Sequence, residues 1–290
     1  MKKVSLIIVN YNEKVRIGRA VLSCVDQTYE DVEVIIVDDG SDTETRNLYK
    51  DIINQNVTKK DIKLIQLERD DPKKRTVSRA FNAGLKASTG DYVAILGSDD
   101  YFDSRYVEKL IKLNTEIAFC NWRIIGRERK EIPIQKYWNF EHSPLTNYIN
   151  FNQLSHECML CSRKVVNEVG FYDERLPRSQ DCDWIVRACL GNYEWKHIPD
   201  VLVNVEKHEV GQQKNYASIH GKTLWSLKNN LNISWILNYL KNGDPKAVLS
   251  FYYGIYDFIH NDKWSLDYKR SDFKKVLHEV TTKLNEERSE

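Results

Sequence analysis

Two adjacent carboxylates, Asp99 and Asp100, stand directly after a short apolar segment of the chain. The segment 92–96 is rich in strand-forming residues and has turn residues on both sides, which predicts a buried strand. Hard oxygen ligands at the end of such a strand suit Mg²⁺ or Mn²⁺ bound together with a phosphate. A loop that only caps the next helix would use the same residues, and this motif alone does not separate the two interpretations.

Two further apolar segments, 4–9 and 32–37, also run into polar residues. The first is followed by Tyr11, and the second by Asp38 and Asp39. The tyrosine ring can stack on a base, and the carboxylates can accept hydrogen bonds from a base or from ribose hydroxyls. A packing tyrosine and an Asp-Gly turn at a helix start explain the same residues without a ligand.

Four more side chains have types suited to chemistry. Arg75 and Arg79 lie near the start of a predicted helix and can clamp a phosphate with paired donors, or simply form a solvated basic face. Asp181 follows a Pro-Arg-Ser turn at another predicted helix start, where it is either a cap stabilised by the helix dipole or a general base. His208 lies in a polar loop, where it can contact a metal ion or phosphate or remain solvated.

Strand and helix patterns alternate along the first 120 residues or so, which indicates crossover connections and a mostly parallel sheet with helices on both faces. Ligands gather at the carboxyl ends of parallel strands, so we expect the polar loops to meet at one edge of the sheet. The predicted strands are 4–9, 32–37, 62–67, 92–96 and 117–122, and the predicted helices are 14–27, 43–53, 76–87 and 104–113.

This alternation stops in the second half of the chain. Residues 124–157 are irregular and aromatic, typical of an acceptor-side insertion or of a cover over the sheet. Helices are predicted at 163–169 and 179–190 and a strand at 194–205. We therefore divide the chain into a half with alternating strands and helices (1–123), a less regular half of the same domain (124–214) and a helical C-terminal extension (215–290).

The composition is that of an ordinary globular protein. The 43 Lys and Arg residues nearly balance the 42 Asp and Glu residues, so no overall field favours nucleic acid. The six cysteines are scattered and predicted to be reduced thiols of a cytoplasmic protein, because the N-terminal apolar segment is too short for a signal peptide. Aromatic residues in the C-terminal extension either rest on the inner face of the plasma membrane, or form internal packing or a homodimer contact.

Seven segments, taken in order, resemble the inverting nucleotide-sugar glycosyltransferases of family 2, which have the GT-A fold. The resemblance spans about residues 1–210. It is carried by residues 4–12, 21–29, 34–42, 80–85, 89–100, 170–174 and 180–181. It implies a metal-dependent transfer of a sugar from a nucleotide-diphospho-sugar, with UDP favoured, to an acceptor hydroxyl of a glycan or lipid-linked glycan. Synthesis of bacterial cell-surface polysaccharide or glycans is the expected setting.

The resemblance implies that residues 1–123 bind the nucleotide-sugar and that residues 124–214 bind the acceptor and supply the catalytic base. Carried over residue by residue, it assigns the catalytic base to Asp181. The remaining assignments fall into two groups. Donor binding goes to Val9, Tyr11, Asp38, Asp39, Arg75, Arg79 and Ser98, and metal binding goes to Asp99, Asp100 and His208.

The chain departs from the family pattern at two positions. Gly97 stands where the family usually has the first Asp of Asp-Ser-Asp-Asp, and Gln180 replaces a frequent Glu before Asp181. The first departure leaves open an alternative, a catalytically weakened nucleotide-binding or scaffolding protein. A nucleotidylyltransferase is less favoured, because the N-terminal region lacks a Gly-rich phosphate loop.

Overall fold

The computed structural model describes residues 1–206, except 57–58, 69–76, 127–129, 137, 139, 142–143, 145–146, 149–153 and 175–179. Arg75, His208 and the whole predicted extension 215–290 therefore lie outside the described residues. Within the part of the chain that is described, no helix is long and apolar enough to cross a membrane.

Four parallel strands form the first half of one sheet. They are β1 (Val4–Asn10), β2 (Val32–Asp38), β3 (Asp61–Gln66) and β4 (Tyr92–Gly97). The strand order is β3-β2-β1-β4-β8-β6-β9-β5, with β7 added beside β6. Because β2 and β4 both pair in parallel with β1, the polar residues that follow these three strands lie along one edge, as the sequence predicts.

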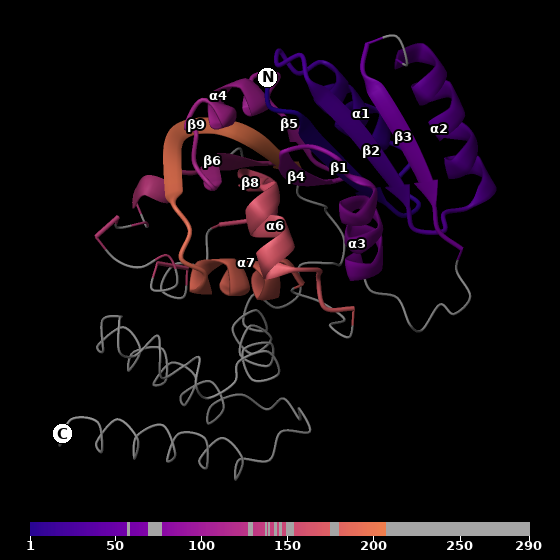
Figure 1. Ribbon diagram of the computed structural model, residues 1–290. Helices are drawn as coiled ribbons and strands as arrows, with labels where there is room; N and C mark the ends of the chain where they lie inside the picture. Colours follow the sequence, from indigo (N-terminus) through magenta and orange to yellow (C-terminus); the bar gives the residue numbers. More distant parts are fainter. Residues whose placement is uncertain are drawn as a thin grey trace, which may run out of the picture.

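Helices α1 (Ile17–Val25), α2 (Thr43–Asn56) and α3 (Val77–Ala87) connect these strands (Figure 1). Every residue of β1 and β2 is buried, which requires a layer on each face because successive side chains point to opposite faces. Helix α3 packs closely against one face, since a Cβ added at Gly84 would lie 2.3 Å from Ile7 Cγ2.

The second half of the described chain completes the same sheet. Strand β6 (Ile117–Ile125) pairs in parallel with the long β9 (Trp195–Glu206), so both predicted halves of the domain share one sheet. The boundary expected at 123/124 falls inside β6. The other elements are β5 (Tyr101–Phe102), α4 (Tyr106–Ile111), β7 (Lys130–Ile132), η2 (Ile134–Lys136), η3 (His156–Cys158), β8 (Met159–Ser162), α6 (Arg163–Val169) and α7 (Gln180–Leu190).

The predicted elements are observed with small shifts at their ends. The helix expected at 14–27 is shorter (Ile17–Val25), because Asn10, Glu13 and Arg16 side chains organise the turn before it. Strands β5, β7 and β8 were not predicted, since segments of two to four residues carry no clear periodicity. Strand β8 runs antiparallel to both β4 and β6, so the sheet is mostly but not entirely parallel.

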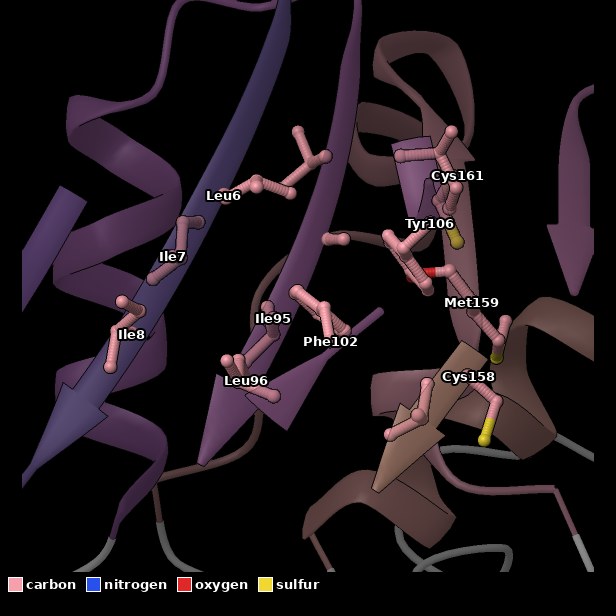
Figure 2. Packing of buried hydrophobic residues seen from close by; sticks show 14 of the residues in the cluster. Leu6, Ile7, Ile8, Ile95, Leu96, Phe102, Tyr106, Cys158, Met159 and Cys161 are labelled. Atoms are coloured by element: carbon pink, nitrogen blue, oxygen red, sulfur yellow. The ribbon is translucent and has the colours of Figure 1, made fainter. Parts of the chain in front are cut away.

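The core joins the two halves of the sheet. Figure 2 shows aliphatic side chains of β1 and β4 in one cluster of buried residues with Phe102 and Tyr106. The rings of Phe102 and Tyr106 stack with centroids 4.0 Å apart. Five cysteines are buried with free thiols: Cys24, Cys120, Cys158, Cys161 and Cys189. Their free thiols are consistent with the predicted reduced state, and the side chains pack in the core.

Candidate active site

The loops that follow β1 and β2 are tied to each other. The Asn12 backbone N–H donates to Ser41 Oγ at 2.9 Å, and the Asp42 N–H donates to Asn12 Oδ1 at 2.8 Å. Asn12 has a positive φ of 54°, a conformation that asparagine tolerates better than most residues. The Asp39 N–H also donates to Asn10 O at 2.8 Å. The two loops therefore form one continuous part of the sheet edge at which β1, β2 and β4 end. We call this edge the rim.

Asp38, at the end of β2, is fully buried. Its carboxylate accepts hydrogen bonds from Arg46 Nε (3.2 Å), the Tyr49 hydroxyl (3.2 Å) and the Ser41 backbone N–H (3.1 Å). Most of its acceptor capacity is thus used in holding the loop, and its contact with a nucleoside stays a prediction.

Asp39 is the neighbouring acid and is also buried. Its Oδ1 lies 3.1 Å from an Arg79 guanidinium nitrogen, which also donates to Glu68 O at 2.8 Å. Arg79, predicted to bind the diphosphate, therefore lies on the part of the rim that follows β2. Tyr11 is 42% exposed after β1, and Val9 is buried and registers with Gly97 of β4.

Three carboxylates surround the space next to the Gly97 Cα, where another residue would have a side chain. A Cβ at this position would lie 2.9 Å from Asp99 Oδ1, 3.5 Å from Asp100 Oδ2 and 3.8 Å from Glu157 Oε1. Ser98 is buried in the tight turn between them, which the Asp100 N–H closes by donating to Gly97 O at 3.2 Å. Glu157 comes from η3, so the space beside Gly97 is shared by acids from two distant segments.

The pKa of Asp100 is raised by its burial and by the acids around it. Burial, with the negative charges of Glu157 and Asp99, raises the pKa of Asp100 to about 9. The Glu206 N–H donates to Asp100 Oδ1 at 2.9 Å, and Arg19 holds the Glu206 carboxylate at 2.8 Å. The end of β9 is thereby fixed beside Asp100. His208 stands two positions later, outside the described residues.

This turn offers oxygen ligands to a divalent cation. Within the described ranges, no group of three or more His, Cys, Asp or Glu side chains is arranged to hold a metal ion by itself. In nucleotide sites, however, Mg²⁺ is usually held by one or two carboxylates together with substrate phosphates. The adjacent Asp99 and Asp100 fit that kind of shared site, and a cation there would offset the repulsion between them.

Asp181 lies in the first turn of α7, and the inner face of that helix is firmly anchored. Trp184 Nε1 donates to Gly170 O at 2.9 Å, and Arg187 donates to Phe171 O at 3.0 Å. Such bonds from side chains to backbone carbonyls fix the helix against the end of α6. The position of Asp181 therefore depends on packed elements rather than on a free loop.

Helix α3 orients the segment that leads to α7. Asn82 Nδ2 donates to Tyr172 O and to Glu174 Oε1, each at 2.9 Å, and Asn82 Oδ1 accepts from the Tyr172 N–H at 2.8 Å. The Ser78 hydroxyl donates to Asp173 O at 2.9 Å. Helix α3 and the segment before the predicted base are therefore held together by several hydrogen bonds.

A buried pair, His156 and Glu157, borders the turn after β4. His156 Nε2 lies 3.4 Å from Glu157 Oε1, and that oxygen borders the space at Gly97. Burial lowers the pKa of His156, but the charges of Glu157 and Asp181 more than offset it and raise that pKa. Helix α7 reaches this pair through packing: Trp184 stacks on Tyr172 with ring centroids 5.8 Å apart, and the Tyr172 hydroxyl lies 3.4 Å from His156 Nδ1.

Sequence reasoning missed His156 and Glu157. Both lie in the region 124–157 that shows no helix or strand period, and only their position directly before a short antiparallel strand could have drawn attention to them. The structure instead reveals them through burial and through their distance to Gly97.

Restoring an acid at position 97 is expected to destabilise the protein. Gly97→Asp would add a fourth carboxylate beside Asp99, Asp100 and Glu157, at a cost of about 1–2 kcal/mol without metal. Gly97→Asn has the same shape without the charge and is the matched control. Urea unfolding in EDTA measures the difference. Equal stability of the Asp and Asn variants would contradict the repulsion that the geometry implies.

The sequence profile of "Glycosyl transferase family 2" matches residues 5–170, more than half of the 290-residue chain. A relative from Haemophilus influenzae, described as an uncharacterized glycosyltransferase, is 30% identical over 268 residues, covering 88% of this chain and 94% of the relative. The Escherichia coli glucosyltransferase WfaP, named for UDP-Glc as donor and GlcNAc-diphosphoundecaprenol as acceptor, is 37% identical over 123 residues. That match covers 42% of this chain and 45% of WfaP.

Solved structures share the fold. Staphylococcus aureus TarS (residues 1–349), in complex with UDP-GlcNAc, aligns with a TM-score of 0.59 at 17% identity over 83% of this chain and 73% of that one. The mannosyltransferase PcManGT from Pyrobaculum calidifontis, in complex with GDP-Man and Mn²⁺, aligns with a TM-score of 0.56 at 16% identity over 89% and 70%. At these identities the likeness concerns the fold alone.

The parallel strands with their acidic edge, the profile match and the relative aligned along most of its length all lead to one assignment. The protein is a glycosyltransferase with the GT-A fold and belongs to glycosyl transferase family 2.

Proposed function

We propose that this glycosyltransferase is metal-dependent and inverting, and that it moves a sugar from a nucleotide-diphospho-sugar, with UDP favoured, to an acceptor hydroxyl. The observation that carries the proposal is the packing that brings α7, the helix of Asp181, toward the acids beside Gly97. Trp184 of α7 stacks on Tyr172, the Tyr172 hydroxyl lies 3.4 Å from His156 Nδ1, and the neighbouring Glu157 borders the space at Gly97. In this arrangement the base would act on the attacking acceptor hydroxyl, and the acidic turn would act on the leaving diphosphate.

The donor is bound along the rim formed by the ends of β1, β2 and β4. Tyr11, half-exposed at this rim, stacks on the base, while Val9 and the acids Asp38 and Asp39 contact the nucleoside. Arg79, with Arg75 beyond the described residues, assists at the diphosphate, and Ser98 lies in the turn that faces it. The donors named for WfaP and TarS favour UDP over other nucleotides.

Asp99 and Asp100 would hold Mg²⁺ or Mn²⁺, with His208 as a further contact. The Mn²⁺ in the PcManGT complex supports the use of a divalent cation in this fold. The cation supplies charge neutralisation to the departing diphosphate. Asp181 accepts the proton of the acceptor hydroxyl, whose oxygen then bonds to the anomeric carbon as the bond to the nucleoside diphosphate breaks. Attack opposite the leaving group inverts the anomeric configuration.

The acceptor is a glycan or lipid-linked glycan, as the acceptor named for WfaP suggests, in cell-surface polysaccharide or glycan synthesis. A cytoplasmic enzyme at the inner face of the plasma membrane would meet such an acceptor. The extension 215–290 is the segment proposed for this contact, or for a homodimer contact.

A thermal-shift panel tests the proposal directly. We expect UDP-glucose or UDP-GlcNAc with Mn²⁺ to raise the melting temperature by about 5 °C or more at ligand concentrations near 100 times Kd, because they bind only the folded state. Asp99→Asn should lose the metal-dependent part of the shift. GDP-mannose is the donor control.

The outcomes of this panel are distinct. No shift with any nucleotide, with or without metal, would overturn the proposed donor class. A shift in a protein that turns over no donor would favour the alternative, a weakened nucleotide-binding member, to which Gly97 points.

A further inference from the structure

Tyr49 of α2 is among the largest fully buried side chains, and the proposed reaction does not use it. Its ring packs in the core, and its hydroxyl lies between the ends of two strands. The hydroxyl accepts a hydrogen bond from Asn10 Nδ2 at 2.5 Å and donates one to Asp38 Oδ1 at 3.2 Å. Because one neighbour donates and the other accepts, the direction of the O–H group is fixed.

The two partners of this hydroxyl are the last residues of β1 and β2. Asn10 and Asp38 pair in register across the two parallel strands, and both are fully buried. The next residues along the chain are Tyr11, which is 42% exposed, and Asp39, whose N–H donates to Asn10 O at 2.8 Å. Each strand therefore ends on a side chain bonded to Tyr49, and the residue that follows it belongs to the rim.

Further contacts extend this link into both loops. Arg46, one turn earlier on α2, places Nε 3.2 Å from the other oxygen of Asp38, Oδ2. The Asn10 amide accepts from the Glu13 N–H at 3.2 Å and donates to Glu13 O at 3.3 Å. Helix α2 thus holds the loop after β2 directly, and it holds the loop after β1 through the Tyr49 hydroxyl.

We propose that Tyr49 is a positioning residue for the nucleoside of the donor: by joining the ends of β1 and β2, it fixes the distance between Tyr11 and Asp39. The inference rests on the proposed function insofar as these two residues contact the nucleoside. A ring that stacks on a base and a carboxylate that accepts hydrogen bonds from the same nucleoside must be held at a set separation for both contacts to form together. Tyr49 acts through Asn10 and Asp38, since it is itself fully buried.

The diphosphate end of the site is held by other contacts. In the turn after β4, Asp100 Oδ1 accepts from the Glu206 N–H at 2.9 Å, and the Asp100 N–H donates to Gly97 O at 3.2 Å. Neither bond involves α2. Arg79 belongs to α3 and has an anchor apart from Asp39, because it donates to Glu68 O at 2.8 Å. Loss of the Tyr49 hydroxyl should therefore weaken binding of the nucleoside and spare binding of the metal with phosphate.

Isothermal titration in Mn²⁺ with two probes, UDP and inorganic pyrophosphate, separates the two ends. Tyr49→Phe keeps the ring in the core and removes only the hydroxyl. It should raise the Kd of UDP about tenfold and leave that of pyrophosphate within about twofold, because only UDP carries a nucleoside. Tyr29→Phe is the matched control: the Tyr29 hydroxyl also donates, to Lys2 O at 2.7 Å, but Tyr29 precedes β2 at the opposite end of the strands, so both Kd values should stay unchanged.

Kinetics of UDP release from UDP-glucose give the same distinction. Tyr49→Phe should raise KM by the same factor as the Kd of UDP, at an unchanged kcat. A Kd for UDP equal to that of the wild type would overturn the inference. An equal rise for UDP and pyrophosphate would also overturn it, because Tyr49 would then be only structural.

Hydrogen exchange measures the arrangement without any ligand. The N–H groups of Asn12, Asp39 and Asp42 make the contacts between the two loops, and they should exchange about tenfold faster in Tyr49→Phe but not in Tyr29→Phe. If the wild-type protein binds no nucleotide, the proposed function fails, and unchanged exchange would separately overturn the role of Tyr49. Should Tyr49→Phe not fold, Asn10→Ala removes the donor to the same hydroxyl and should give the same difference between UDP and pyrophosphate.

Discussion

Asp181→Asn is expected to lower the rate of sugar transfer by about 10²–10⁴-fold while the donor still binds, the usual range for losing a general base. The amide has nearly the same shape as the carboxylate but cannot take up the acceptor proton. Trp184 and Arg187 anchor α7 through backbone carbonyls, so the variant should fold as the wild type does.

Release of UDP from the UDP-sugar selected by the thermal-shift panel measures the effect, with a lipid-linked GlcNAc-diphosphate as the acceptor probe. Asp61→Asn is the control, because Asp61 begins β3 at the opposite end of the strands and should retain full activity. Isothermal titration with UDP and Mn²⁺ should give the same Kd for all three proteins. Normal turnover by Asp181→Asn would show that the base has been assigned to the wrong residue.

The meeting of the loops after β1, β2 and β4 at one edge could be predicted because its signals are local. Apolar runs before Asn10, Asp38 and Gly97 indicate strands, and the parallel arrangement then brings their ends to one edge. The partners of these residues could not be predicted. That Asp39 pairs with Arg79, and that Asp38 is fully buried, depends on how α2 and α3 pack.

The part that sequence reasoning missed depends on long-range contacts. Glu157 is 60 positions from Gly97, and no periodicity connects them; only the antiparallel pairing of β8 with β4 brings η3 to the end of β4. The same holds for Asn82, whose bonds to Tyr172 and Glu174 unite two motifs that the family resemblance treats as separate. Motifs in sequence order predict the candidate site, whereas the packing shows which of its groups lie close together.

A second group of charges lies at the other end of the strands. Glu33 of β2 is fully buried, and its Oε1 accepts hydrogen bonds at 2.6 Å from the Ser5 hydroxyl and from the Thr89 N–H. Its Oε2 lies 2.8 Å from Lys63 Nζ and 3.0 Å from Lys3 Nζ. One carboxylate therefore joins β1, β2, β3 and the turn before β4, which positions the parallel strands whose far ends form the site.

Glu33→Gln is expected to destabilise the protein by about 3 kcal/mol at pH 7, the low end for breaking a buried ion pair, because both lysines are partly exposed and screened. Glu44→Gln is the control: Glu44 also pairs with a lysine, Lys14, but is exposed, so its loss should cost less than about 0.5 kcal/mol. Urea unfolding of the three proteins measures both effects, and a Glu33→Gln variant as stable as the wild type would contradict this role.

The stability difference between wild type and Glu33→Gln should depend on pH in a definite direction. Burial acts to raise the pKa of Glu33, but the hydrogen bonds and cations hold it well below its usual range. A depressed folded-state pKa means that the stabilisation is complete above the unfolded-state pKa of about 4.3 and declines as the pH falls toward the folded-state value. The difference between wild type and Glu33→Gln should therefore be equal at pH 6 and pH 8 and smaller at about pH 3.5. A difference that grew on acidification would mean that the carboxylate is not charged in the folded protein.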